Sequence, residues 1–235
     1  MRFRRICFDL DDTLIPNSFL YDTAKWRCGS LIAKALGIRC PRASHLLTLM
    51  EETDRAAFQK FGLSADRFPA SMVRAYETAA ENAGMPVDPE IARRVRDTAE
   101  RYKLGPYRPL PGVRPALKQL RAFRCQLHLV TAGDDLLQRV KIVKAGLGSH
   151  FDSIDVVPKD KKPALAAIVG DRPELGVMVG DSPGSDIQPA IELGMTAVFV
   201  PSNTWSVVHA DVDPSKYHTI SSVRELPALL QKLSR

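Results

Sequence analysis

The chain has 235 residues, of which 45% are hydrophobic and 26% are charged, and its mean hydropathy is −0.13. This composition is ordinary for a globular protein and excludes an intrinsically disordered chain, a collagen-like repeat and a disulfide-rich miniprotein. Lys and Arg number 33 against 27 Asp and Glu, so the formal net charge is +6. The basic residues are scattered, which is compatible with an anionic substrate but does not indicate nucleic-acid binding.

The sequence predicts neither a membrane span nor a secretion signal. No segment approaches the roughly 18 uninterrupted apolar residues of a membrane helix. The basic first residues lack the long apolar core of a signal peptide. The four cysteines form no C-x-x-C pair and lack zinc-ligand spacing. We therefore expect a cytoplasmic protein with free thiols and no membrane partner.

Five short, almost continuously apolar segments alternate with helical patterns. Such segments are typical of strands covered on both faces, as in a parallel sheet; they span 4–10, 126–131, 154–157, 176–179 and 196–200. The helical patterns between and after them span 111–123, 134–145, 163–169, 186–193 and 226–233. In 134–145, Leu137, Val140 and Val143 recur at helical spacing. The alternation predicts an α/β fold with a doubly wound, Rossmann-like parallel sheet.

Residues from about 16 to 105 interrupt this alternation and contain no convincing strand. Helical patterns cover 18–36, 42–61, 65–83 and 89–104, and glycines and prolines separate them. We therefore expect two domains. An α/β core would comprise residues 1–15 and 107–235, and an inserted all-helical domain would comprise residues 16–106.

The first strand is followed by a pair of acids, Asp9 and Asp11. Because they lie two residues apart, their side chains point the same way at an extended strand end. Two carboxylates held together raise each other's pKa unless a cation lies between them. The pair therefore indicates a divalent metal, or a nucleophile beside a proton donor. The alternative is an acidic turn that caps the next helix.

The second and third strands are followed by groups that suit an anion. Ligands of parallel α/β sheets bind outside the carboxyl ends of the strands. Thr131 precedes Ala132 and Gly133, and its hydroxyl and the free N–H groups of a helix start suit a phosphate oxygen, although a simple helix cap is the alternative. A lysine after the third strand would neutralise a phosphoryl group, although a solvated run is the alternative; the candidates are Lys159, Lys161 and Lys162.

The fourth strand is followed by the run Gly-Asp-Ser-Pro-Gly-Ser-Asp over residues 180–186. Its acids, Asp181 and Asp186, are oxygen ligands of the kind that Mg²⁺ prefers. The alternative is a glycine turn in which Asp186 caps the next helix. Signals at four strand ends converge on one edge of the predicted sheet, which favours a functional site there.

These segments resemble the motifs of the haloacid dehalogenase superfamily of phosphohydrolases. Residues 8–14, Phe-Asp-Leu-Asp-Asp-Thr-Leu, resemble its first motif, D-x-D-x-T, and residues 180–186 resemble its fourth, G-D-x-x-x-x-D. Thr131 resembles the second motif. Lys159 resembles the third, because it keeps a following apolar pair in helix phase better than Lys162 does. Asp160 stands where proline is common in the family. The insert matches the family's helical cap in position and character.

The resemblance implies a Mg²⁺-dependent phosphatase, a phosphoric monoester hydrolase, that acts through an aspartyl-phosphate intermediate. Asp9 would attack phosphorus, and Asp11 would serve as general acid and then general base. Mg²⁺ would be held by the Asp9 carboxylate, the Asp11 backbone carbonyl and Asp181, with Asp186 orienting a metal-bound water or the lysine. The phosphoryl oxygens would be bound by Thr131, by a backbone N–H near Ala132 or Gly133, and by Lys159. The cap would exclude water and choose the substrate.

The expected partner is a small phosphorylated metabolite, and the protein is expected to be a monomer or a homodimer. Asp11, together with Thr13, favours phosphoryl chemistry over dehalogenation. A phosphomutase with the same nucleophile is the alternative. A non-catalytic binding module is a weaker one, because Asp9, Asp11 and Asp181 are all present. His128 lies within a predicted strand and is expected to be structural. Asn203 and Trp205 follow the fifth strand at the pocket rim and have no assigned role.

Overall fold

A computed structural model describes residues 2–202 and 211–235 of the chain, so Asn203 and Trp205 lie outside the described residues. The chain divides into two compact units. The core unit comprises Met1–Ser18 and Pro106–Arg235, and the helical unit comprises Phe19–Gly105. Among the described residues, each helix is too short or too polar to span a lipid bilayer.

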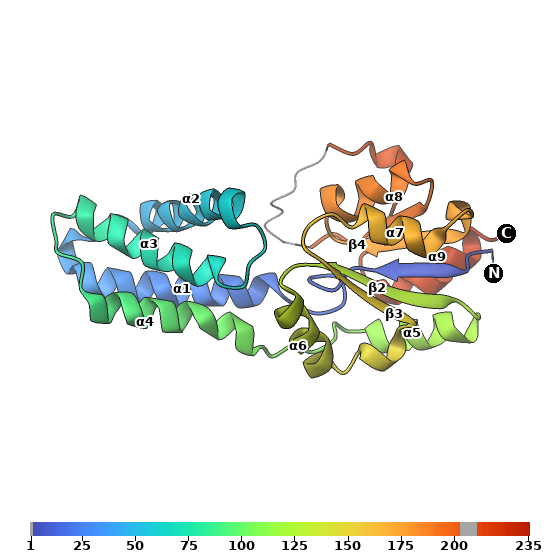
Figure 1. The fold of residues 1–235 in the computed structure, drawn as a ribbon, viewed down its shortest axis with the longest axis horizontal. Coiled ribbons are helices and arrows are strands. Elements are labelled where there is room, and N and C mark those ends of the chain that lie inside the picture. The colour runs from blue at the N-terminus through green and yellow to red at the C-terminus, as the bar shows by residue number, and fades with distance from the viewer. Residues whose placement is uncertain (1, 203–210) are drawn as a thin grey trace. The chain divides into compact units, whose positions relative to one another are not determined.

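The core unit is built on a parallel sheet, which confirms the predicted α/β class. The described residues form six strands in the order β3-β2-β1-β4-β5-β6 (Figure 1). Their bounds are β1 Arg5–Phe8, β2 Gln126–Ala132, β3 Ser153–Val157, β4 Gly176–Gly180, β5 Thr196–Phe199 and β6 His218–Thr219. All the pairings are parallel. Five strands match the predicted segments. The sixth was not predicted, because its two exposed residues carry no apolar pattern.

Helices cover both faces of this sheet. They are α5 Val113–Ala122, α6 Asp135–Ala145, α7 Lys162–Val169, α8 Gln188–Glu192 and α9 Leu226–Lys232. Helices α5 and α6 lie on one face and α7 and α8 on the other, as right-handed crossovers require (Figure 1). The α7 and α8 face packs a core that includes Val130, Leu165, Met178 and Ile187. The sheet is therefore covered on both sides, which accounts for its continuously apolar strands.

Helix α6 begins and ends as its sequence predicts but buries an unexpected face. The Asp134 side chain caps its start by accepting from the backbone N–H of Leu137, and Gly146 ends it in the left-handed conformation at φ 60°. The apolar residue Val143 is nevertheless 77% exposed. The buried residues of α6 are Gln138, Lys141, Ile142 and Ala145. Two polar side chains of this helix therefore point into the protein.

The helical unit packs a core of its own. Its helices are α1 Ser18–Leu36, α2 Ala43–Phe61, α3 Arg67–Asn82 and α4 Pro89–Glu100. Residues 19–105 are all described and contain no strand. Helix α3 packs against both α2 and α4. The buried side chains include Ile32, Met50, Met72, Tyr76 and Val95.

Candidate active site

The sheet order brings three sequence-predicted positions to one edge. Strands β2, β1 and β4 are neighbours, and Thr131, Asp9 and Asp181 lie at or just beyond their carboxyl ends. The Asp9 N–H donates to the Val179 carbonyl at 2.9 Å, which fixes Asp9 beside β4. The strand order reverses direction between β1 and β4, and ligands of doubly wound sheets bind at this switch point.

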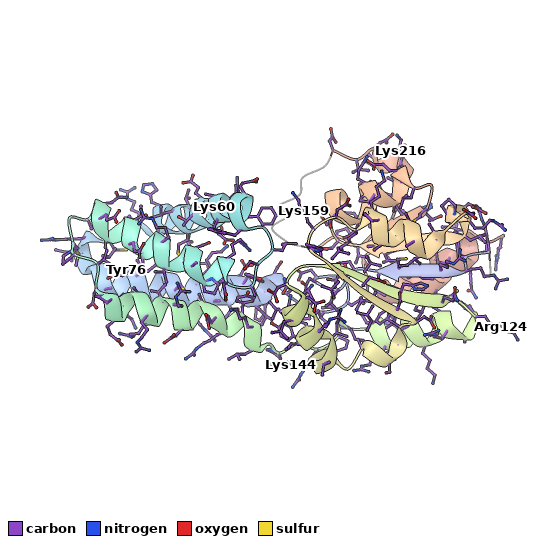
Figure 2. All side chains as sticks on the ribbon, viewed as in Figure 1. Lys60, Tyr76, Arg124, Lys144, Lys159 and Lys216 are labelled. Atoms are coloured by element: carbon purple, nitrogen blue, oxygen red, sulfur yellow. The ribbon has the colours of Figure 1, made fainter. Side chains whose placement is uncertain are left out.

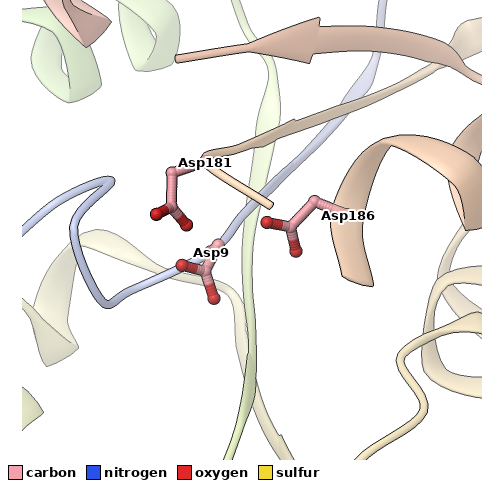
Figure 3. A group of neighbouring side chains, drawn as sticks. All are labelled: Asp9, Asp181 and Asp186. Atoms are coloured by element: carbon pink, nitrogen blue, oxygen red, sulfur yellow. The ribbon is translucent and has the colours of Figure 1, made fainter. Parts of the chain in front are cut away.

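Three carboxylates meet there. One oxygen each from Asp9, Asp181 and Asp186 lies within 4.8 Å of the others (Figure 3). Asp9 and Asp186 are buried. The backbone N–H of Ser182 donates to Asp186 at 3.0 Å. A Cβ at Gly180 would clash with the Asp186 carboxylate, so this approach is open only to glycine.

The lysine of this cluster is Lys161, so the prediction of Lys159 is wrong. Lys161 Nζ donates to Asp9 Oδ1 at 2.5 Å and to Asp186 Oδ1 at 2.6 Å, and the residue is 3% exposed. Lys159 is exposed on the loop before α7 (Figure 2). The alternative, Lys162, pairs with Glu192 at the surface. The helix-phase argument favoured Lys159, which lies two residues before Lys161. That argument fails because α7 begins only at Lys162, so helical spacing does not extend back to Lys159.

Negative charge exceeds positive charge in this cluster. Burial raises the pKa of the Asp9 carboxyl well above its usual range; Lys161 opposes this rise, and Asp186 and Asp181 add to it. Burial alone would lower the pKa of Lys161, but the carboxylates of Asp186 and Asp9 raise it above its ordinary value. The cluster thus combines three carboxylates with one ammonium, which contacts those of Asp9 and Asp186, and its carboxylate oxygens are a donor set that suits a divalent cation.

Asp11 belongs to a second polar group. Lys141 Nζ donates to its Oδ1 at 3.0 Å and to its Oδ2 at 2.7 Å, and Gln138 Nε2 donates to Oδ2 at 3.1 Å. Lys141 also donates to Asn17 Oδ1 at 2.8 Å. The hydrogen bonds that hold the Asp11 carboxylate therefore come from α6 and not from the cluster of Asp9, Asp181 and Asp186.

The neighbouring acid, Asp12, has the capping role that was the alternative for the pair. Its backbone adopts a φ of 57°, and its carboxylate accepts from the N–H groups of Asn17 and Ser18. The Ser18 hydroxyl donates to it as well, at 2.6 Å. Asp12 thereby satisfies the start of α1, which leaves Asp9 and Asp11 for other partners.

A model of the haloacid dehalogenase-like hydrolases matches residues 3–194. The chain belongs to this family. The predicted membership of the haloacid dehalogenase superfamily and the predicted hydrolase activity are confirmed, and the relatives described next agree with the predicted class of phosphoric monoester hydrolase.

Two curated relatives and one solved structure illustrate the likeness. The chain is 28% identical to a glyceraldehyde 3-phosphate phosphatase of Methanocaldococcus jannaschii over 98% of each chain. It is 37% identical to an N-acylneuraminate-9-phosphatase of Rattus norvegicus over 52% of this chain and 51% of the relative. A haloacid dehalogenase-like family hydrolase from Xanthomonas campestris superposes with a TM-score of 0.78 at 26% identity, covering 99% of this chain and 92% of the other.

The predicted phosphate-binding residues of this hydrolase have different surroundings. Thr131 is buried, and its hydroxyl oxygen accepts from Gln138 Nε2 at 2.6 Å. The Ala132 carbonyl accepts from the same nitrogen at 3.4 Å. The Gly133 N–H donates to the Val157 carbonyl at 2.9 Å, so in this structure its donor is already paired, and phosphate binding by a backbone N–H near Ala132 or Gly133 stays a prediction. Backbone pairing between β2 and β3 continues past the strand end and uses this donor.

Three site residues escaped the sequence prediction. The sequence marks Lys161 only as one of three candidate lysines, and it gives Gln138 and Lys141 no functional signature of their own. The apolar residues of α6 gave the only pattern there, and Gln and Lys on a helix usually indicate a solvated face. One signal was available: Gln138 and Lys141 lie three residues apart, so a helix presents them on one side.

Proposed function

We propose that this hydrolase is a phosphatase that cleaves the phosphate monoester of a small metabolite through a phosphoryl group carried on Asp9. The observation that carries the proposal is the placement of Asp9 at the sheet's switch point. There its buried carboxylate contacts Lys161 and adjoins two further carboxylates. Asp11, two residues further on, supplies a second carboxylate for proton transfer.

In the first step, an oxygen of the Asp9 carboxylate attacks phosphorus and forms a new P–O bond. The bond between phosphorus and the substrate's ester oxygen breaks, and that oxygen takes its electron pair. The Asp11 carboxyl, protonated at this stage, gives its proton to the leaving oxygen. The products are the free alcohol and an aspartyl phosphate on Asp9.

In the second step, water replaces Asp9 on phosphorus. The Asp11 carboxylate takes a proton from the water as its oxygen bonds to phosphorus. The bond between phosphorus and the Asp9 oxygen then breaks, which releases inorganic phosphate and regenerates the Asp9 carboxylate. Lys161 and the Thr131 hydroxyl stabilise the phosphoryl oxygens in both steps, because phosphoryl transfer depends chiefly on positioning and charge neutralisation.

The excess of carboxylates fits one Mg²⁺ ion. Asp9, Asp181, Asp186 and the backbone carbonyl of Asp11 are the groups that would hold it. When bound, the ion supplies positive charge that offsets the negative charges of Asp9 and of the phosphoryl group. One oxygen each from Asp9, Asp181 and Asp186 lies within 4.8 Å of the others, and Mg²⁺ prefers such oxygen ligands, which supports this assignment.

The substrate class is a small phosphorylated metabolite of the sugar or sugar-acid type. The names of the two relatives describe a phosphorylated three-carbon aldehyde and a phosphorylated sugar acid, so their shared feature is a phosphate monoester on a small polar molecule. We assign substrate selection to the helical unit, Phe19–Gly105. The chemistry resides in the core unit.

The test is phosphate release from a panel of phosphorylated metabolites, with and without Mg²⁺. Asp9→Asn should abolish the release, and Asp171→Asn, which alters an exposed acid, should not. Release that needs no Mg²⁺, or that survives in Asp9→Asn, would refute the proposal. A sugar monophosphate incubated with the corresponding bisphosphate tests the mutase alternative, since a mutase yields isomerised sugar phosphate in place of free phosphate.

A further inference from the structure

Asp11 is held by two side chains of α6 to which the proposed steps give no role. Lys141 contacts both oxygens of the carboxylate, and Gln138 contacts Oδ2. The Lys141 side chain is 3% exposed and that of Asp11 is 23% exposed. A carboxylate with donors on both oxygens has little freedom to rotate.

The burial of these two side chains runs against the composition of α6. Leu136 and Val143 are 74% and 77% exposed, although either is a better residue to bury. Removing an ammonium from water is unfavourable unless good partners replace the solvent. The contacts of Gln138 and Lys141 therefore explain why this face of the helix points inward.

Several further contacts fix the two side chains. The third partner of the Lys141 ammonium is Asn17 Oδ1, so its three N–H groups face three oxygens. Lys141 Nζ also lies 5.8 Å from the centre of the Tyr107 ring. Gln138 packs against Gly133, where a Cβ would come within 3.1 Å of Gln138 Cγ. Their positions are thus set by three separate segments of the core unit.

We propose that Lys141 and Gln138 are positioning residues for Asp11. They fix its carboxylate where it exchanges protons with the leaving oxygen and with the attacking water. Gln138 Nε2 also contacts the Thr131 hydroxyl, so the proton-transfer group and a phosphate-binding group keep a constant separation. The inference rests on the proposed function, because it requires Asp11 to act as an acid and base.

The test uses the different needs of two leaving groups. An alkyl phosphate must receive a proton as its alcohol leaves, whereas p-nitrophenyl phosphate releases a stable phenolate without one. We expect Lys141→Met to slow first-turnover release of the alkyl alcohol about 100-fold, within the range of general acid catalysis. Release of p-nitrophenol should slow by less than about tenfold, compared with about 100-fold for the alkyl alcohol, because this leaving group needs no proton. Gln138→Leu should shift the same ratio less, and Lys144→Met, on the exposed side of α6, should not shift it.

The two proposals fail in different ways. Wild-type protein without Mg²⁺-dependent hydrolysis, or an active Asp9→Asn, would refute the proposed function. An active wild type in which Lys141→Met slows both substrates equally, or neither, would refute the positioning role alone. Circular dichroism checks the fold of each variant. If Lys141→Met does not fold, Gln138→Leu decides the matter by the same ratio, and Lys141→Arg, which keeps the charge, should restore part of the alkyl ester's rate.

Discussion

Two polar groups of the site each join an acid of the first motif to a buried lysine, yet their charges differ. The Asp9 group consists of Asp9, Asp181, Asp186 and Lys161, and the Asp11 group consists of Asp11, Gln138 and Lys141. Asp9 shares Lys161 with Asp186, and Asp181 adds a third carboxylate. Asp11 is the carboxylate paired with the Lys141 ammonium, which also donates to the neutral Asn17, and Asp11 accepts from the Gln138 carboxamide as well. The excess of negative charge around Asp9 suits a metal ion, and the balanced charge around Asp11 suits a group that transfers protons. Asp9 and Asp11 lie only two residues apart after β1, yet their side chains occupy different electrostatic environments.

The largest expected effect distinguishes Lys161 from Lys159. Lys161→Met removes the ammonium that contacts Asp9, so we expect kcat to fall about 100- to 1,000-fold, as when one donor to a developing charge is lost. Lys159→Met alters an exposed lysine of the same loop and should stay within about twofold of wild type. Steady-state phosphate release measures both. A damaging Lys159→Met beside a harmless Lys161→Met would overturn the assignment.

The next effect separates the two groups by their response to metal. At Mg²⁺ concentrations about 100-fold above Kd, a site present only in the folded state stabilises the protein by about 2.7 kcal/mol. Asp181→Asn should remove most of this stabilisation. Gln138→Leu should keep it, because Gln138 belongs to the Asp11 group. Thermal unfolding with and without Mg²⁺ provides the measurement, and an equal loss in both variants would show that the groups act as one site.

Thr131 links the two groups through Gln138, so its hydroxyl should have an intermediate effect. Thr131→Val keeps the shape of the side chain but removes the acceptor for Gln138 Nε2 and the donor proposed for phosphate. We expect kcat/KM to fall about tenfold, the size of one hydrogen bond. Thr219→Val, at an exposed position of β6, is the matched control. An unchanged kcat/KM in Thr131→Val would remove this residue from the site.

The smallest effect concerns His128, a polar residue of β2 outside both groups. Burial lowers its pKa below the ordinary value of 6.5, against the opposing effect of Asp152 and Asp155. Its Nδ1 lies 2.9 Å from Ser153 Oγ, and its buried Nε2 has no partner in the described part of the structure.

The folded state therefore favours the neutral ring. As the pH falls below about 6.5, the unfolded chain takes up this proton first, so stability is lost below that pH and is complete above it. Urea unfolding at pH 7.5 and 5.5 should show a smaller loss in His128→Gln than in wild type, with activity at neutral pH unchanged. His45→Gln, at an exposed position, should show the wild-type loss. If His128→Gln lost as much stability between pH 7.5 and 5.5 as the wild type does, the acid sensitivity would belong to other groups.

Most of the fold was predictable because its signals are local. Continuous apolar runs such as 176–179 show a strand buried on both sides, and Asp134 and Gly146 mark the two ends of α6. Two-residue β6 has no such signal, because pairing with β5 is what makes it a strand. Within the site, the acids Asp9, Asp181 and Asp186 were predictable from their places after β1 and β4, since parallel strands end at the same edge.

Five of the strands, the helices and the strand-end acids follow from local sequence, because each depends on neighbours a few residues away. Which lysine reaches which carboxylate depends on long-range packing. Lys161 meets Asp9 across 152 residues and Lys141 meets Asp11 across 130, so no local pattern encodes either pair. Long-range packing also explains why α6 buries Gln138 and Lys141 and exposes Val143. The hydrogen bonds of Gln138 and Lys141 to the distant Asp11 carboxylate outweigh the apolar pattern of the helix.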